Sequence, residues 1–176
     1  MTLHAAAPPL EYEAQQWMID GRRNLLIIVA LPVMPYVRQT RTTRWRQDHP
    51  AGARARAYNE SRATLRDALA GIMLAKHLKP LPAAPLGMAS SFWLKNPSTS
   101  DLGNCEKALE DAANKILYPD DRWIWHRGNG FKAKGTPRFR LHLWELGGGH
   151  RDDLPARAGR PGPGCSGGLD GGLPEA

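Results

Sequence analysis

The chain has 176 residues, enough for one compact domain and too few for two comfortable ones. Its formal net charge of +7 predicts a surface that attracts polyanions, so nucleic acid is the leading class of partner. The longest apolar run, Leu25 to Leu31, is far shorter than the roughly 20 residues that span a bilayer, which argues against a membrane protein. The N-terminus lacks the pattern of a secretory signal, so a cytoplasmic location is expected.

The two ends of the chain are predicted to lie outside the domain. Residues 1–20 are expected to form a loose arm, with a short helix near Tyr12 to Met18. Residues 147–176 are rich in Gly, Pro, Ala and Arg and offer too little apolar surface to offset chain entropy, so a disordered tail is expected. This tail carries three Arg against four acids, so its charge is −1 and the rest of the chain carries +8. The domain is expected over residues 21–146.

Hydrophobic periodicity predicts strands that alternate with two helices. The apolar, β-branched run from residue 24 to residue 31 is typical of a central strand, and further strands are expected at 86–94, 122–126 and 138–145. Amphipathic helices are expected at about 54–77 and at 102–117, and a turn or basic loop at 128–135. The order β-α-β-α-β-β predicts a single α/β domain, in which two main helices pack on a mixed sheet.

A run of acids around one lysine points to phosphodiester chemistry. Asp101 stands at the start of the second predicted helix, Lys107 nearly two turns on, and Asp120 and Asp121 after the helix, ahead of a strand. Phosphodiester hydrolysis needs hard oxygen ligands that hold Mg²⁺, and a cation near the developing charge assists it. A helix that packs on the sheet and returns as a strand can bring Asp101 and Asp121 together.

This pattern resembles the RusA family of Holliday junction resolvases, small metal-dependent nucleases common in prophages. The family motif is D-[LI]-D-N-x-x-K, followed by D-A in a helix and by D-D before a hydrophobic strand. The chain reads D-L-G-N-C-E-K from Asp101 to Lys107, then D-A at 111–112 and D-D at 120–121, and the similarity covers roughly residues 24–146. The resemblance implies a RusA-like fold that acts as a homodimer on four-way DNA junctions. It implies metal binding by Asp101 and Asp121, with Asp120 as a further candidate, and charge stabilisation by a catalytic Lys107.

One position departs from the family pattern. The second aspartate of the motif falls on Gly103, which has no ligand atom. Mg²⁺, or Mn²⁺ in its place, is commonly held by only one or two protein carboxylates together with water and phosphate. The sequence therefore leaves two functions open: a junction-cleaving endonuclease, and a catalytically impaired protein of the same fold that binds junctions. A basic nucleic-acid-binding module unrelated to nucleases is disfavoured by the spacing of Asp101, Lys107 and Asp121.

Each of these residues also has an ordinary structural interpretation. Asp101 can cap the helix, and Asp120 with Asp121 can form a turn after Pro119. Lys107 can pair with Asp111, one turn further along the helix, which is worth about 0.2–0.5 kcal/mol, and for this lysine both interpretations stay open. Because the three spacings match one motif together, we favour a functional site.

Basic residues are expected to contact DNA phosphates. Residues 38–79 contain eight Arg and two Lys against three acids, and neutralised phosphates release counterions, so affinity should fall steeply with salt. Trp123 and Trp125 are expected on a sheet face or subunit interface, and His126 and His142 in strands rather than on a metal. The residues predicted to bind DNA are Arg38, Arg41, Arg44, Arg46, Lys132 and Lys134.

Overall fold

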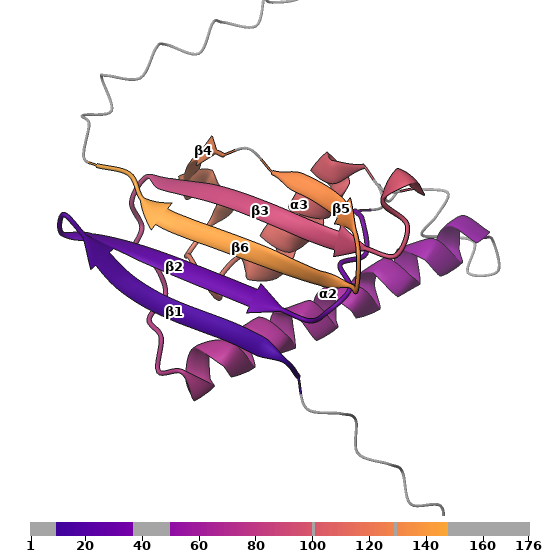
Figure 1. The fold of residues 1–176 in the computed structure, drawn as a ribbon, viewed down its shortest axis with the longest axis horizontal. Helices are drawn as coiled ribbons and strands as arrows, with labels where there is room; N and C mark the ends of the chain where they lie inside the picture. The colour runs from indigo at the N-terminus through magenta and orange to yellow at the C-terminus, as the bar shows by residue number, and fades with distance from the viewer. Residues whose placement is uncertain (1–9, 37–49, 100, 129, 148–176) are drawn as a thin grey trace, which may run out of the picture.

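The structure, a computed structural model, describes residues 10–36, 50–99, 101–128 and 130–147. They form one mixed sheet with two helices against it (Figure 1), so the α/β class and the two-helix arrangement expected from the sequence are confirmed. The predicted tail, from residue 148 onward, lies outside the described residues. The same holds for four predicted DNA-binding residues, Arg38, Arg41, Arg44 and Arg46.

The sheet has the strand order β1-β2-β6-β3-β4, and β5 also pairs with β3. Strands β1, β2, β6 and β3 run antiparallel to one another in this order, whereas β4 and β5 run parallel to β3. The last strand of the chain, β6, therefore lies between the first hairpin and β3. The strands are β1 (Tyr12–Ile19), β2 (Arg22–Val29), β3 (Leu86–Leu94), β4 (Ile124–Arg127), β5 (Phe131–Lys134) and β6 (Arg138–Glu145).

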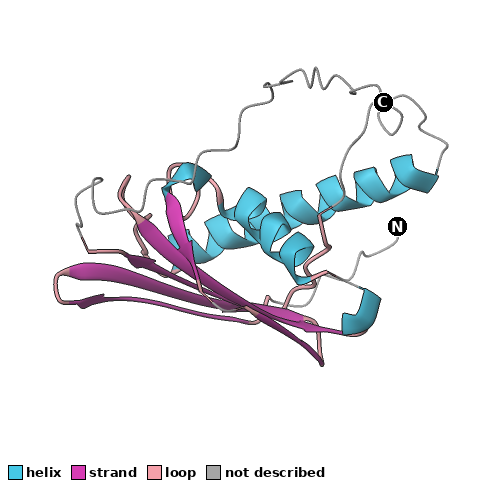
Figure 2. Ribbon diagram, turned by 90° about the horizontal axis from the view of Figure 1, so that it is seen from above, coloured by secondary structure: helices cyan, strands magenta, loops and turns pink. Residues whose placement is uncertain are grey.

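Two helices, α2 (Pro50–Ala75) and α3 (Leu102–Ala113), lie on the same face of the sheet (Figure 2). Two 3-10 turns, η1 (Pro97–Thr99) and η2 (Asp121–Trp123), flank α3 in the chain. The alternation predicted for β6 is confirmed, because every second side chain is buried in the core beneath the helices. No helix in the described part of the chain is long and apolar enough to cross a membrane. The side chains that β2, β6 and the helices contribute to the core include Leu25, Ile27, Val29, Leu65, Leu69, Leu109, Phe139, Leu141 and Leu143.

Two segments differ from their sequence-based predictions. Residues 12–19, expected in a loose arm with a short helix, form β1, which pairs along its whole length with β2. Asp20 and Gly21 both have positive φ, at 49° and 75°, and this backbone suits a two-residue hairpin turn that follows the twist of the strands. The segment 128–135, expected as a turn or loop, contains β5. The order of elements is therefore β-β-α-β-α-β-β-β.

Candidate functional site

Helix α3 begins where the sequence predicts, with Asp101 as its N-cap. The Asp101 carboxylate accepts a hydrogen bond of 3.0 Å from the backbone N–H of Gly103, one of the amides that a helix start leaves without an internal partner. The helix-capping interpretation of Asp101 is thus confirmed. Asp101 is exposed at the N-terminal end of α3.

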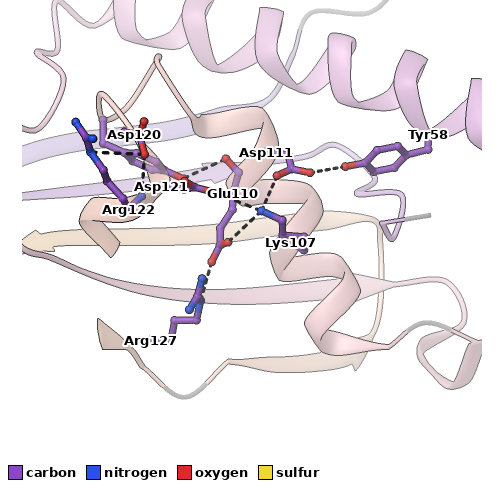
Figure 3. A network of polar contacts seen from close by, with 9 residues as sticks. Tyr58, Lys107, Glu110, Asp111, Asp120, Asp121, Arg122 and Arg127 are labelled. Carbon is purple, nitrogen blue, oxygen red and sulfur yellow. Dashed lines mark hydrogen bonds and ion pairs between the residues drawn. The ribbon is translucent and has the colours of Figure 1, made fainter. Parts of the chain in front are cut away.

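Further along α3, an ion-pair cluster surrounds the ammonium group of Lys107 (Figure 3). The Lys107 Nζ lies 2.8 Å from Asp111 Oδ1, 3.5 Å from Asp121 Oδ2 and 4.0 Å from Glu110 Oε2. Glu110 also binds Arg127 of β4. We call these five residues the Lys107 cluster. It joins the second half of α3 to the segment that enters β4.

Glu110 is the most deeply buried member of the cluster. Its side chain is 3% exposed, and Arg127 Nε donates a hydrogen bond of 2.7 Å to its Oε1 atom. A buried carboxylate is costly unless it is paired and hydrogen-bonded, so this bond stabilises the charge and fixes β4 against α3. The same hydrogen bond is the main cause that raises the pKa of Arg127 above its usual value. Neither Glu110 nor Arg127 is predicted as a site residue from the sequence.

Asp111 connects the cluster to α2. The hydroxyl group of Tyr58 donates a hydrogen bond of 3.0 Å to Asp111 Oδ2, while Lys107 binds the other oxygen. Burial, and then the charge of Asp111, raise the pKa of Tyr58, so the phenol keeps its proton and remains a donor. Both carboxylate oxygens of Asp111 therefore have a partner, and the carboxylate fixes the orientation of the Lys107 side chain.

The environment of Lys107 keeps it charged. Burial alone would lower its pKa, but the hydrogen bond to Asp111 and the negative charges of Asp111, Glu110 and Asp121 outweigh burial, and the pKa is raised above its usual value. A lysine of this kind stays an ammonium ion at neutral pH. It therefore suits electrostatic stabilisation of an anion rather than removal of a proton.

The structure brings Lys107 and Asp121 together, whereas Asp101 stands apart from the cluster. Lys107 lies six positions after Asp101, which is about 9 Å along the helix axis at 1.5 Å per residue. The Lys107 side chain is held by Asp111, one turn towards the C-terminal end of α3, and so it points away from Asp101. Asp120 caps η2, where its carboxylate accepts a 3.0 Å hydrogen bond from the backbone N–H of Arg122.

The predicted metal ligands do not gather around one point. Among the described residues, no group of three or more His, Cys, Asp or Glu side chains is arranged to hold a metal ion. The set of Asp101, Asp120 and Asp121 therefore does not form such a group. The other two predicted DNA-binding residues, Lys132 and Lys134, are exposed on β5.

A second acid on α3, Glu106, is likewise not predicted as a site residue from the sequence. Burial, the largest cause, raises its pKa, although a 3.4 Å hydrogen bond from the Ser90 hydroxyl opposes the effect. A Cβ atom at Gly130 would overlap the Glu106 carboxylate, so the absence of a side chain there makes room for it. Polar residues at positions 106 and 110 lie one turn apart on α3 and both face the sheet. Such a pair in a helix that packs on a core is the sequence signal that could have revealed them.

Comparison with known proteins adds no family assignment. No protein-family model matches the chain, and no curated protein matches it. The resemblance to the RusA family therefore rests on the motif residues from Asp101 to Asp121.

Proposed function

We propose that the protein is a Mg²⁺-dependent endodeoxyribonuclease that cuts four-way DNA junctions, as a homodimer in the cytoplasm, with a site weakened by Gly103. The observation that carries this proposal is the contact between Lys107 of α3 and Asp121 of η2. These two motif residues are 14 positions apart in the chain, and their charged groups lie 3.5 Å apart in the structure. A homodimer with twofold symmetry suits a junction in which two like strands are cut.

The described carboxylates form no ready site for Mg²⁺, so this proposal needs the substrate to complete it. Asp101 is exposed and the Asp121 side chain is 43% exposed, so both offer hard carboxylate oxygens that solvent and a DNA phosphate can reach. Mg²⁺ commonly takes one or two protein carboxylates and fills its remaining positions with water and phosphate oxygens. When bound, the ion would polarise the scissile phosphate and lower the pKa of a water molecule.

The chain's own residues have separate roles in this proposal. Lys107 places a permanent positive charge where a phosphate oxygen gains negative charge in the transition state. Asp111 holds the ammonium group in position, and Tyr58 in turn orients Asp111 from α2. Arg127 neutralises Glu110, so that a phosphate meets less negative charge behind Lys107.

A second function, junction binding without cleavage, has a specific observation in its favour. Position 103 offers no carboxylate, and the described residues contain no cluster of three metal-binding side chains. A site with one anchor missing can hold an ion loosely, and misplacement of a catalytic group by about 1 Å can reduce a rate about 10²-fold. The protein would then recognise junctions and cut them slowly or not at all.

Cleavage of a labelled four-way junction, with and without Mg²⁺ or Mn²⁺, tests the proposal. The decisive variant is Gly103→Asp, which restores the second aspartate of the motif. A Cβ atom at position 103 would lie 3.7 Å from Asp101 Oδ1, an ordinary contact, so the fold accepts the change. We expect Gly103→Asp to raise the cleavage rate about 10²-fold in the presence of the metal.

Two controls separate a restored ligand from other effects. Gly103→Asn has nearly the same size and helix propensity but no charge, and it should gain little activity. Gly103→Asp combined with Asp121→Asn should lose most of the gain. If the natural chain already cuts as fast as Gly103→Asp, the idea of an incomplete site is wrong. If all variants bind junctions and none cuts them, the binding function replaces the nuclease.

A further inference from the structure

The face of the sheet opposite α2 and α3 is bare in the described chain. Both helices lie on one side of the strands, and no described element covers the other side (Figure 2). Because side chains alternate along a strand, β6 directs its apolar residues to the helices and the others outward. We call this surface the open face and define it by Trp17, Trp93, Arg138, Arg140, His142 and Trp144.

Aromatic rings form a continuous row across the open face. The rings of Trp17 on β1 and His142 on β6 are stacked, with centroids 5.6 Å apart and planes 15° apart. The centroids of His142 and Trp144 are 4.9 Å apart, and His126 on β4 meets the edge of Trp144 at 6.0 Å. Rings from three strands therefore touch in sequence over the sheet.

A glycine in β3 allows the indole ring of Trp144 to lie over that neighbouring strand. Gly87 of β3 pairs with Trp144, and a Cβ atom at Gly87 would overlap the indole ring. Glycine weakens a strand interior, so its presence here has a packing reason: the indole occupies the space above it. On β2, the Asn24 side chain lies 3.3 Å from His142 Nε2 and helps to fix that ring.

A second aromatic pair lies further along the same face and carries a cation. The rings of Trp93 on β3 and Phe131 on β5 are 5.3 Å apart and nearly perpendicular, and Phe131 is 47% exposed. The guanidinium of Arg138 lies 4.2 Å from the centroid of Trp93. Arg140, two residues along β6 on the same side, is exposed between this pair and the row.

The charges of the open face favour an anion over a second copy of the chain. Arg138 and Arg140 lie on β6, the middle strand of the sheet order. Burial together with the charge of Arg140 lowers the pKa of His142, which keeps that ring neutral and able to stack at pH 7. Glu13, an acid on this side, lies on the edge strand β1. Two copies packed through this face would bring arginines against arginines, whereas a phosphate chain would neutralise them.

We propose that the open face binds single-stranded DNA, whose bases stack on the exposed rings while Arg138 and Arg140 contact the phosphates. Aromatic side chains beside a basic groove are how proteins hold single strands without reading their sequence, because every base has a flat face. The site lies on the side of the sheet opposite the Lys107 cluster. Only the choice of DNA over RNA rests on the nuclease function proposed above.

Fluorescence anisotropy of a labelled 12-nucleotide oligo(dT), measured without metal on the full chain, tests the proposal. Arg138→Gln with Arg140→Gln should weaken binding and lower the salt slope by about 1.4, since each phosphate contact on a single strand contributes about 0.7. Phe131→Ala should weaken binding roughly tenfold and leave the slope unchanged, because it removes a stacking surface and no charge. A duplex of the same length should bind this face more weakly, because its bases are already stacked.

The matched control is Lys79→Gln with Lys115→Gln, which removes two exposed charges away from the open face. This double variant loses the same net charge and should keep most of the affinity and slope. The proposal is wrong if the arginine and lysine double variants bind oligo(dT) equally, or if the natural chain does not bind it. If Phe131→Ala alters dimerisation in sedimentation and leaves oligo(dT) binding intact, the face joins two copies instead. No junction cleavage is measured, so failure of the nuclease proposal would leave these outcomes unaffected.

Discussion

Removal of the charge on Arg127 should destabilise the fold through Glu110. Arg127→Met keeps the length of the side chain in β4 but deletes the donor that lies 2.7 Å from a carboxylate whose side chain is 3% exposed. Loss of one partner from a buried pair costs about 3–5 kcal/mol. We expect about 2–3 kcal/mol here, because Arg127 is 56% exposed and Lys107 remains 4.0 Å from the other Glu110 oxygen. At about 4 °C per kcal/mol, Tm should fall by about 8–12 °C.

Thermal and urea denaturation measure this effect against a matched arginine. Arg122→Met removes a residue whose side chain is 74% exposed and whose ion pair with Asp120 is 3.9 Å long, so it should cost at most about 1 kcal/mol. Equal losses in the two variants would refute the importance of the buried pair.

Three further outcomes follow from buried groups. Burial raises the pKa of Glu106, so the natural protein loses free energy of unfolding as the pH rises through that pKa. In urea titrations between pH 4 and 8, Glu106→Gln should therefore become more stable relative to the natural protein as the pH rises. A difference in unfolding free energy that stays constant with pH would contradict this. Burial raises the pKa of Cys105 to about 11, which keeps the thiol protonated and unreactive at pH 8. In a Cys165→Ser variant, a thiol reagent should label Cys105 at pH 8 only after the protein unfolds. Rapid labelling of the folded protein would disprove the burial of Cys105. Gly87→Ala should cost about 1–3 kcal/mol in urea denaturation and change the near-ultraviolet circular dichroism of Trp144, whereas an unaltered spectrum would contradict the close contact.

The elements that can be predicted from the sequence are those with a clear hydrophobic periodicity or a helix-capping residue. The alternation in β6 and the cap at Asp101 are local features, and both are found in the structure. Strand β1 was missed because it lies at the sheet edge and mixes Gln and Glu with apolar residues, so its alternation is weak. The Asp20-Gly21 pair, which favours a hairpin turn, is the local signal that could have identified it.

The candidate site was only partly accessible from the sequence. The sequence suggested that Asp101 would approach Asp121, whereas in the structure Lys107 is the motif residue whose charged group lies beside Asp121, because of how α3 packs. The partners Tyr58, Glu110 and Arg127 come from three different elements, and their pairing is set by tertiary packing that no local period encodes. Charged residues are usually exposed, so the buried position of Glu110 could be inferred only from its place one turn after Glu106 in a helix that packs on the core.

The position of β6 has a consequence for how the polypeptide folds during synthesis. Asn24 of β2 pairs with Trp144 of β6, 120 positions later, and β3 pairs with the other edge of the same strand. Until β6 has left the ribosome, the inner edges of β2 and β3 both present unpaired backbone groups, and the apolar side of the first hairpin lacks its neighbour. Such intermediates aggregate readily, so the nascent chain depends on a late strand to close its sheet. Premature stops before residue 138 should therefore yield insoluble or degraded fragments rather than smaller folded domains.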